Sequence, residues 1–130
     1  RSTGRSQGPT LDAGGLFIHT LWILARDYLT DFELMILLSI LRVGDEAYGV
    51  PVAREIEKTG GRSVVLATVY AALDRLEANG LVSSTLGDPT PERGGRAKRL
   101  FRVTPSGLKA VRQTRRALTR LWTGLVQVEG

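Results

Sequence analysis

The sequence predicts a mainly α-helical fold with one small β-hairpin, and two observations carry this prediction. Apolar residues recur at helical spacing in four segments between Thr30 and Val126. Between the third and fourth segments lie two short strand-like runs, 81–86 and 97–103, separated by a stretch rich in Gly and Pro. The expected order is therefore three helices, a hairpin and a long last helix. A chain of 130 residues suffices for one such domain with extensions.

The first two helices have recognisable ends. Thr30 and Glu33 fit a capping box, in which each side chain accepts a hydrogen bond from the backbone N–H of the other. A helix should begin here and run to about Arg42. Apolar residues nearly encircle it, so we expect it to be largely buried. A second helix is expected over about 50–58, with Pro51 in its first turn and a Gly pair after its end.

The third helix, over about 66–78, has two different faces. Its apolar face is expected to pack on the domain and comprises Leu66, Val69, Ala72, Leu73 and Leu76. The opposite face comprises Ala67, Thr68, Ala71, Asp74 and Arg75, with Tyr70 and Glu77 on the boundary. Gly80 fits the left-handed residue that follows a helix end.

The last helix is predicted to begin at Pro105, behind Thr104 as N-cap, and to reach about Val126. Its apolar residues follow a spacing close to a heptad, interrupted by Arg115. They are Leu108, Val111, Leu118, Leu121, Trp122 and Leu125. A helix of about 33 Å extends past a small domain. This stripe therefore favours a partner helix across a two-fold axis, and thus a homodimer, over closure of the monomer core.

Charge and composition narrow the class of function. The formal net charge is +5, and it is uneven, with −2 in residues 1–61 and +7 in residues 62–130. This basic second half favours an anionic partner such as nucleic acid. The absence of cysteine and the single histidine, His19, argue against a metal site. No catalytic or cofactor-binding motif appears at a recognisable spacing. We therefore expect that the protein binds no cofactor and is not an enzyme.

The sequence also predicts the location of the protein and the character of its N-terminal residues. The longest apolar runs fall short of the roughly 20 residues that a membrane span needs, so we expect no membrane contact and a cytoplasmic, nucleoid-associated protein. There is no initiator Met. Residues 1–15 are interpreted as a flexible tail or an expression remnant, and 16–28 as an additional N-terminal helix. The DNA-binding domain is assigned to 29–103 and the dimerisation helix to 104–130.

Three helices followed by a hairpin with a basic tip form the order of a winged helix-turn-helix. In that fold the third helix enters the major groove and the hairpin reaches the DNA backbone or minor groove. Small residues allow close approach, and the basic tip neutralises phosphates. The candidate DNA-binding residues are Thr68, Tyr70, Ala71, Arg75, Arg93, Arg96, Lys98 and Arg99. Taken singly, an Ala-rich face can reflect helix propensity and a Gly/Arg loop a solvated turn, but their combination favours DNA binding.

Three blocks of sequence resemble the PadR family. The segment ATVYAALDRLEANGL, 67–81, resembles that family's third-helix signature, 47–57 resembles the opening of its second helix, and GGRAKRLFRVTPSG, 94–107, resembles its hairpin. The resemblance covers about 29–126 and is to the branch with a short C-terminal part. It implies a dimeric bacterial transcriptional repressor that releases DNA when a small effector binds. It also implies DNA contacts by Thr68, Tyr70, Arg75, Arg96 and Lys98.

The expected function is therefore that of a repressor that binds a pseudo-palindromic operator in double-stranded DNA as a homodimer. An effector pocket between subunits, for a small aromatic or cationic molecule, would be lined by Trp122 and Trp22. The alternative is a winged-helix protein-interaction module whose basic surface binds an acidic partner. Two positions depart from the family pattern, Ala71 where Pro is frequent and Phe101 where Tyr is common, and neither alters the expected fold.

Overall fold

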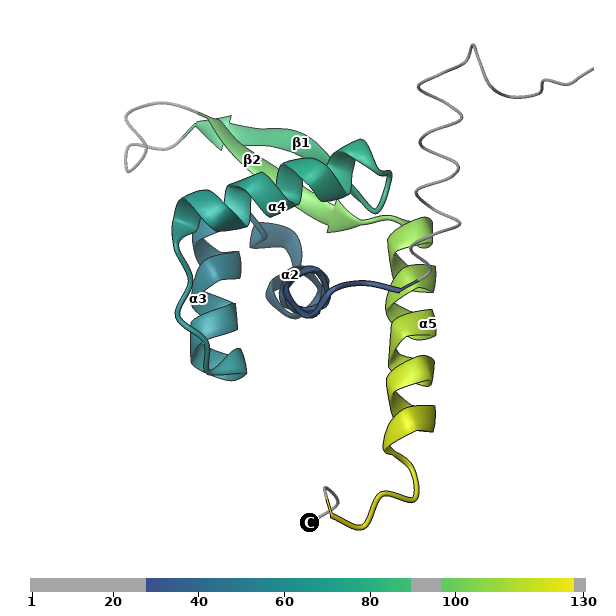
Figure 1. Cartoon of the computed structure of the whole chain (residues 1–130). Helices are drawn as coiled ribbons and strands as arrows, with labels where there is room; N and C mark the ends of the chain where they lie inside the picture. Colours follow the sequence, from purple (N-terminus) through teal and green to yellow (C-terminus); the bar gives the residue numbers. More distant parts are fainter. Residues whose placement is uncertain (1–27, 90–96, 128–130) are drawn as a thin grey trace, which may run out of the picture.

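The computed structural model of the chain describes residues 28–89 and 97–127. Its elements follow the predicted order, and the predicted fold class is confirmed (Figure 1). They are helix α2 (Asp31–Val43), the short 3-10 helix η2 (Gly44–Glu46), helices α3 (Gly49–Gly60) and α4 (Leu66–Ala78), strands β1 (Val82–Pro89) and β2 (Ala97–Val103), and helix α5 (Pro105–Trp122). The predicted tail, all of the predicted N-terminal helix except Tyr28, and the hairpin tip lie outside the described residues.

Helices α2, α3 and α4 pack around one core, to which the hairpin contributes two side chains. Figure 1 shows α2 end-on, with α3 on one side, α5 on the other, and α4 and the hairpin above it. The largest fully buried side chains come from all three helices and both strands: Ile36, Leu37, Val52, Ile56, Val69, Leu73, Leu76, Val82 and Phe101. Burial of these apolar side chains is the main force that holds the helices together.

The hairpin is a two-stranded antiparallel sheet. Val82 pairs with Val103, Ser84 with Phe101 and Leu86 with Arg99, and the register shifts between Leu86 and Pro89. The backbone N–H of Phe101 also donates to the carbonyl of Ala47 at 2.8 Å. Because Phe101 is buried as well, this residue attaches the base of the hairpin to the helical core.

The predicted start of α2 and the predicted ends of α3 and α4 are confirmed. Thr30 Oγ1 accepts from the N–H of Glu33 at 3.2 Å, and Glu33 Oε1 accepts from the N–H of Thr30 at 2.9 Å, which completes the capping box. Gly61, with φ of 70°, caps α3, and Gly80, with φ of 77°, follows α4. Left-handed φ values are disfavoured for residues with a Cβ, so these two glycines set where the helices stop.

The beginning of α5 is held tightly against the hairpin. Thr104 Oγ1 accepts from the N–H of Gly107 at 3.0 Å, as predicted for the N-cap. A Cβ at Gly107 would lie only 2.1 Å from the carbonyl oxygen of Leu81, so the helix approaches the start of the hairpin more closely than any side chain allows. The register of α5 on the domain therefore depends on this glycine.

The second half of α5 extends away from the domain. Thr114, which is buried, accepts through Oγ1 from the N–H of Leu29 at 2.9 Å. Beyond it, Leu121 is 73% exposed and Trp122 is 56% exposed. In the parts of the chain that the structure describes, no helix is both long and apolar enough to cross a membrane.

Three details differ from the sequence-based expectations. Helix α2 is not buried all round, since Leu38 is 41% exposed and Leu41 is 46% exposed: too few elements surround it. Leu66, expected on the core face, is 39% exposed, because it is the first residue of α4 and the helix first becomes buried at Val69. Helix α5 ends at Trp122 rather than near Val126, and the extended Thr123 breaks the helical pattern.

Candidate nucleic-acid interface

The outward face of α4 is a strip of small side chains with one basic residue. Ala67, Thr68 and Ala71 are exposed, as is Arg75 one turn further along the helix. Arg75 makes no ion pair with any residue in 28–89 or 97–127. Small side chains permit a close approach to a flat or grooved surface, and an unpaired guanidinium suits a base edge or a phosphate.

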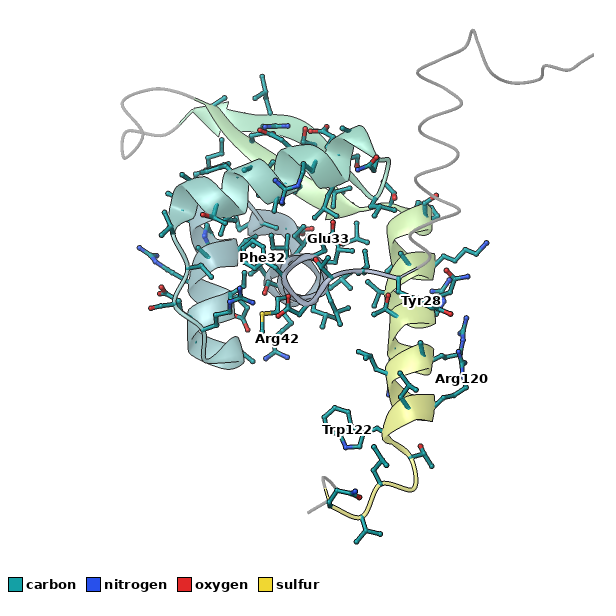
Figure 2. The ribbon with its side chains drawn as sticks, viewed as in Figure 1. Tyr28, Phe32, Glu33, Arg42, Arg120 and Trp122 are labelled. Carbon is teal, nitrogen blue, oxygen red and sulfur yellow. The ribbon has the colours of Figure 1, made fainter. Side chains whose placement is uncertain are left out.

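The segment that leads into α4 contacts the first turn of α2. Arg62 Nη1 lies 3.3 Å from Asp31 Oδ2, and its guanidinium lies 5.1 Å from the ring centre of Phe32. Both partners belong to the first turn of α2, where Figure 2 labels Phe32. The segment before α4 is therefore tied to α2, and α4 itself begins at Leu66 without a side-chain N-cap.

Tyr70 has a packing role that the sequence did not reveal. Its side chain is half-buried and lies against the start of α3, so that a Cβ at Gly49 would be 2.2 Å from Tyr70 Cζ. The absence of a side chain at Gly49 thus lets α3 and α4 cross at close range. In the structure the ring of Tyr70 packs at the contact between these two helices, and its predicted contact with DNA stays a prediction.

Lys98 is the second residue of β2 and lies near the tip end of the hairpin. Its Nζ is 4.7 Å from the ring centre of Tyr48 and 3.6 Å from Glu46 Oε1, and its side chain is largely buried. Of the other basic residues predicted for this region, Arg93 and Arg96 lie outside the described residues.

Arg99 connects the hairpin to α4. Its Nη1 lies 2.8 Å from Asp74 Oδ1, and its Nη2 binds Glu77 Oε1. Ser84 of β1 donates to Glu77 Oε2 at 2.7 Å, and the guanidinium of Arg99 lies 4.8 Å from the ring centre of Phe101. We call the group of Arg99, Asp74, Glu77 and Ser84 the Arg99 bridge.

The Arg99 bridge alters the acidity of its members. The hydrogen bond from Ser84, followed by that from Arg99, lowers the pKa of Glu77 below its ordinary value. The hydrogen bond to Asp74, followed by that to Glu77, raises the pKa of Arg99 further. Both shifts favour the charged forms of Glu77 and Arg99. The bridge holds one guanidinium and two carboxylates, which gives it a formal net charge of −1.

A second candidate site lies on the other side of the molecule, between α2 and α5. This apolar groove has a volume of about 370 Å³. Its lining residues are Leu34, Leu38, Val111, Arg115, Leu118, Thr119, Trp122 and Thr123. Figure 2 shows Trp122 projecting from the end of α5 toward the side where α2 lies, and Arg120 projecting away from it.

The groove is lined both by residues that were predicted at a dimer interface and by residues that were predicted in the core. Of the six apolar residues expected at a dimer interface, Leu108 and Val111 are half-buried in the monomer, while Leu118, Leu121, Trp122 and Leu125 are exposed. Leu34 and Leu38 of α2 were expected in the core and instead line the groove. The sequence did carry a signal for this second apolar surface: α2 has more apolar residues around it than one core can cover. Trp22 lies outside the described residues.

Comparison with known proteins agrees with this architecture. Residues 37–113 match the model of the transcriptional regulator PadR-like family. They span the second half of α2, the whole of α3, α4 and the hairpin, and the first half of α5. The transcriptional regulator Rv3488 of Mycobacterium tuberculosis is 39% identical over 79 residues, which cover 59% of this chain and 67% of that protein.

Solved structures give the same result. A transcriptional regulator from Clostridium thermocellum superposes with a TM-score of 0.57 at 28% identity, over 69% of this chain and 82% of the other. A PadR-like transcriptional regulator from Bacillus cereus shares the fold, with a TM-score of 0.57 over the same shares at 22% identity. The resemblance seen in the third helix and the hairpin is thereby confirmed, and the chain belongs to the PadR-like family of transcriptional regulators.

Proposed function

We propose that this protein is a DNA-binding repressor that recognises a pseudo-palindromic operator as a homodimer and is released by a small-molecule effector. The observation that carries the proposal is the outward face of α4, where Thr68, Ala71 and Arg75 are exposed and Arg75 has no ion pair among the described residues. The chain continues from α4 into the hairpin. A helix with this surface fits the major groove, which is about 12 Å wide. In the proposed complex Arg75 contacts a base edge or phosphate, and the hairpin tip, with Arg93 and Arg96, contacts the backbone.

The DNA proposal is tested by selecting duplexes from a random library with the whole chain and then titrating salt. We expect an enriched inverted repeat, and affinity that falls linearly with the logarithm of salt concentration. Arg75→Ala should weaken binding and reduce the salt slope by about one if Arg75 contacts a phosphate. Lys58→Ala is the matched control, since Lys58 is an exposed cation at the far end of α3. Selection of no preferred sequence would refute the proposal.

The homodimer is supported by the apolar surface of α5. Leu118, Leu121 and Trp122 are exposed large hydrophobic side chains on one short segment, and Leu38 of α2 continues this surface across the groove. Exposed apolar surface of this kind is usually covered by another protein surface. Because a second copy presents the same α5 stripe, a two-fold axis along it would bury both stripes and place two α4 helices for one palindromic site.

The effector is proposed to occupy the apolar groove. Its walls are aliphatic side chains and the ring of Trp122, which suit an aromatic molecule. Arg115 lies in the same lining, and its positive charge disfavours a cation and favours an aromatic molecule that carries an anionic group. Quenching of Trp fluorescence by such compounds, lost in Trp122→Phe, is the expected observation. A library of aromatic acids that causes no quenching would contradict this assignment.

A further inference from the structure

Three sets of contacts attach the hairpin to the rest of the described chain. Lys98 and Arg102 of β2 contact residues 45–48. At its base, Phe101 is buried in the core and its N–H donates to Ala47. Further toward the tip, the Arg99 bridge joins Arg99 of β2 to Asp74 and Glu77 on α4. Within 28–89 and 97–127, these are the only ion pairs between α4 and the hairpin.

We propose that Arg99 is a positioning residue, which fixes the angle between the hairpin and α4 rather than contacting DNA itself. The consequence for DNA rests on the function proposed above. Without the bridge, no ion pair within the described residues joins the hairpin to α4, so the hairpin can pivot relative to α4 about Phe101 and its contacts with residues 45–48. A pivot there moves the basic tip relative to α4, so the two surfaces no longer meet one duplex in the required geometry.

The hydrogen bonds of Arg99 argue against a direct contact. Nη1 donates to Asp74, Nη2 to Glu77, and Nε to Ser84 Oγ at 3.3 Å. These hydrogen bonds use three of the five N–H groups of the guanidinium, so a phosphate would compete with two carboxylates for Arg99. Moreover, the bridge as a whole carries a net charge of −1, so its field repels a phosphate. The cation is therefore committed to the protein's own carboxylates.

The sharpest test is a substitution that should change the affinity for DNA in opposite directions, depending on whether Arg99 contacts DNA or positions the hairpin. Glu77→Gln removes a negative charge beside the proposed interface. If Arg99 contacts DNA, this change frees its guanidinium and strengthens binding to the selected duplex. If Arg99 positions the hairpin, the loss of one partner weakens binding by about two- to fivefold, the range of a half-exposed ion pair. Asp88→Asn, which removes an exposed carboxylate elsewhere on β1, is the matched control.

Substitution of Arg99 also distinguishes a positioning role from a contact with DNA. Arg99→Gln should weaken binding by about three- to tenfold with an unchanged salt slope, whereas a phosphate contact would lower the slope by about one. Arg99→Lys should recover part of the affinity, because one ammonium can still bind Asp74 or Glu77. Tighter binding by Glu77→Gln, or a reduced slope in Arg99→Gln, would overturn the proposal.

A measurement without DNA separates this inference from the proposed function. Amide hydrogen exchange of the hairpin, Val82–Pro89 and Ala97–Val103, should become about two- to tenfold faster in Arg99→Gln and Glu77→Gln, while exchange in α2 stays unchanged. In Asp88→Asn the hairpin should exchange as in the wild type. If the wild type selects no DNA but the hairpin loosens in these variants, the repressor proposal fails and the positioning role stands. Unchanged hairpin exchange in both variants would refute the positioning role.

Discussion

Replacement of Gly107 by alanine tests how the long C-terminal helix is held on the domain. A Cβ at this position would lie 2.1 Å from the carbonyl oxygen of Leu81 and 2.7 Å from Val103 Cγ1. Real Cβ atoms essentially never come closer than 3.0 Å to another heavy atom, so α5 has to move by about 0.9 Å away from Leu81. The same carbonyl accepts from the N–H of Thr104 at 3.0 Å, and this hydrogen bond stretches with the shift.

The expected loss of stability follows from these contacts. Forced overpacking costs about 1–3 kcal/mol, and it lies toward the upper end here because the obstacle is backbone rather than a flexible side chain. A weakened hydrogen bond adds about 1 kcal/mol, and the better helix propensity of alanine offsets about 1 kcal/mol. We therefore expect Gly107→Ala to lower the free energy of unfolding by about 3 kcal/mol, and the Tm by about 15 °C in a domain of this size.

The assay is urea and thermal unfolding of the whole chain, followed by circular dichroism at one fixed protein concentration, since the proposed dimerisation would link stability to concentration. Gly60→Ala is the matched control. Gly60 is the last residue of α3, and a Cβ there would meet only Ile56 Cγ2, at 3.8 Å. This control should leave stability unchanged or raise it by up to about 1 kcal/mol. Equal stability of Gly107→Ala and wild type would refute the close-approach reasoning.

Two further predictions concern acidity and assembly. Because the native pKa of Glu77 is lowered, the unfolded state binds more protons below about pH 4.5, so the stabilisation from the Arg99 bridge is present at neutral pH and is lost as the pH falls through that range. With the side chains of Arg99 and Glu77 39% and 32% exposed, we expect at most about 1 kcal/mol, and urea unfolding of Glu77→Gln should show a correspondingly flatter dependence on pH. Leu118→Glu combined with Trp122→Glu should give a monomer in analytical ultracentrifugation, because it places two charges on the α5 apolar stripe, whereas Arg120→Glu on the opposite side should leave assembly unchanged. A wild type that sediments as a monomer at micromolar concentration would contradict the homodimer.

Part of the candidate site was accessible from the sequence because it depends on one helix. The exposed positions of Thr68, Ala71 and Arg75 follow from helical periodicity and from the apolar residues on the opposite face. The place of α4 in the order of elements then pointed to DNA. Periodicity says nothing about partners from other segments, however, so it did not distinguish Arg75, which has no ion pair among the described residues, from Arg99, whose charge is bound by two carboxylates of α4.

The sequence by itself determined where α2 and α5 begin and where α4 ends, since those signals are satisfied within a few residues. Thr30 with Glu33, Thr104 with Gly107, and the left-handed Gly80 all act locally. What only the tertiary structure decided depends on residues far apart in the chain. Which side chains a helix buries is a property of the elements that cover it, as the exposed Leu38 and Leu66 demonstrate.

The same reason applies to the two sites. The apolar groove exists because α5 lies beside α2, more than 60 residues away in the sequence, and the Arg99 bridge exists because β2 returns alongside α4. Hydrogen bonds and ion pairs of this kind form only once packing has brought the elements together, and packing is decided by the burial of the whole apolar surface. Local pattern therefore predicted the parts of this regulator, whereas the roles of Tyr70, Arg99 and Leu38 arose from how those parts meet.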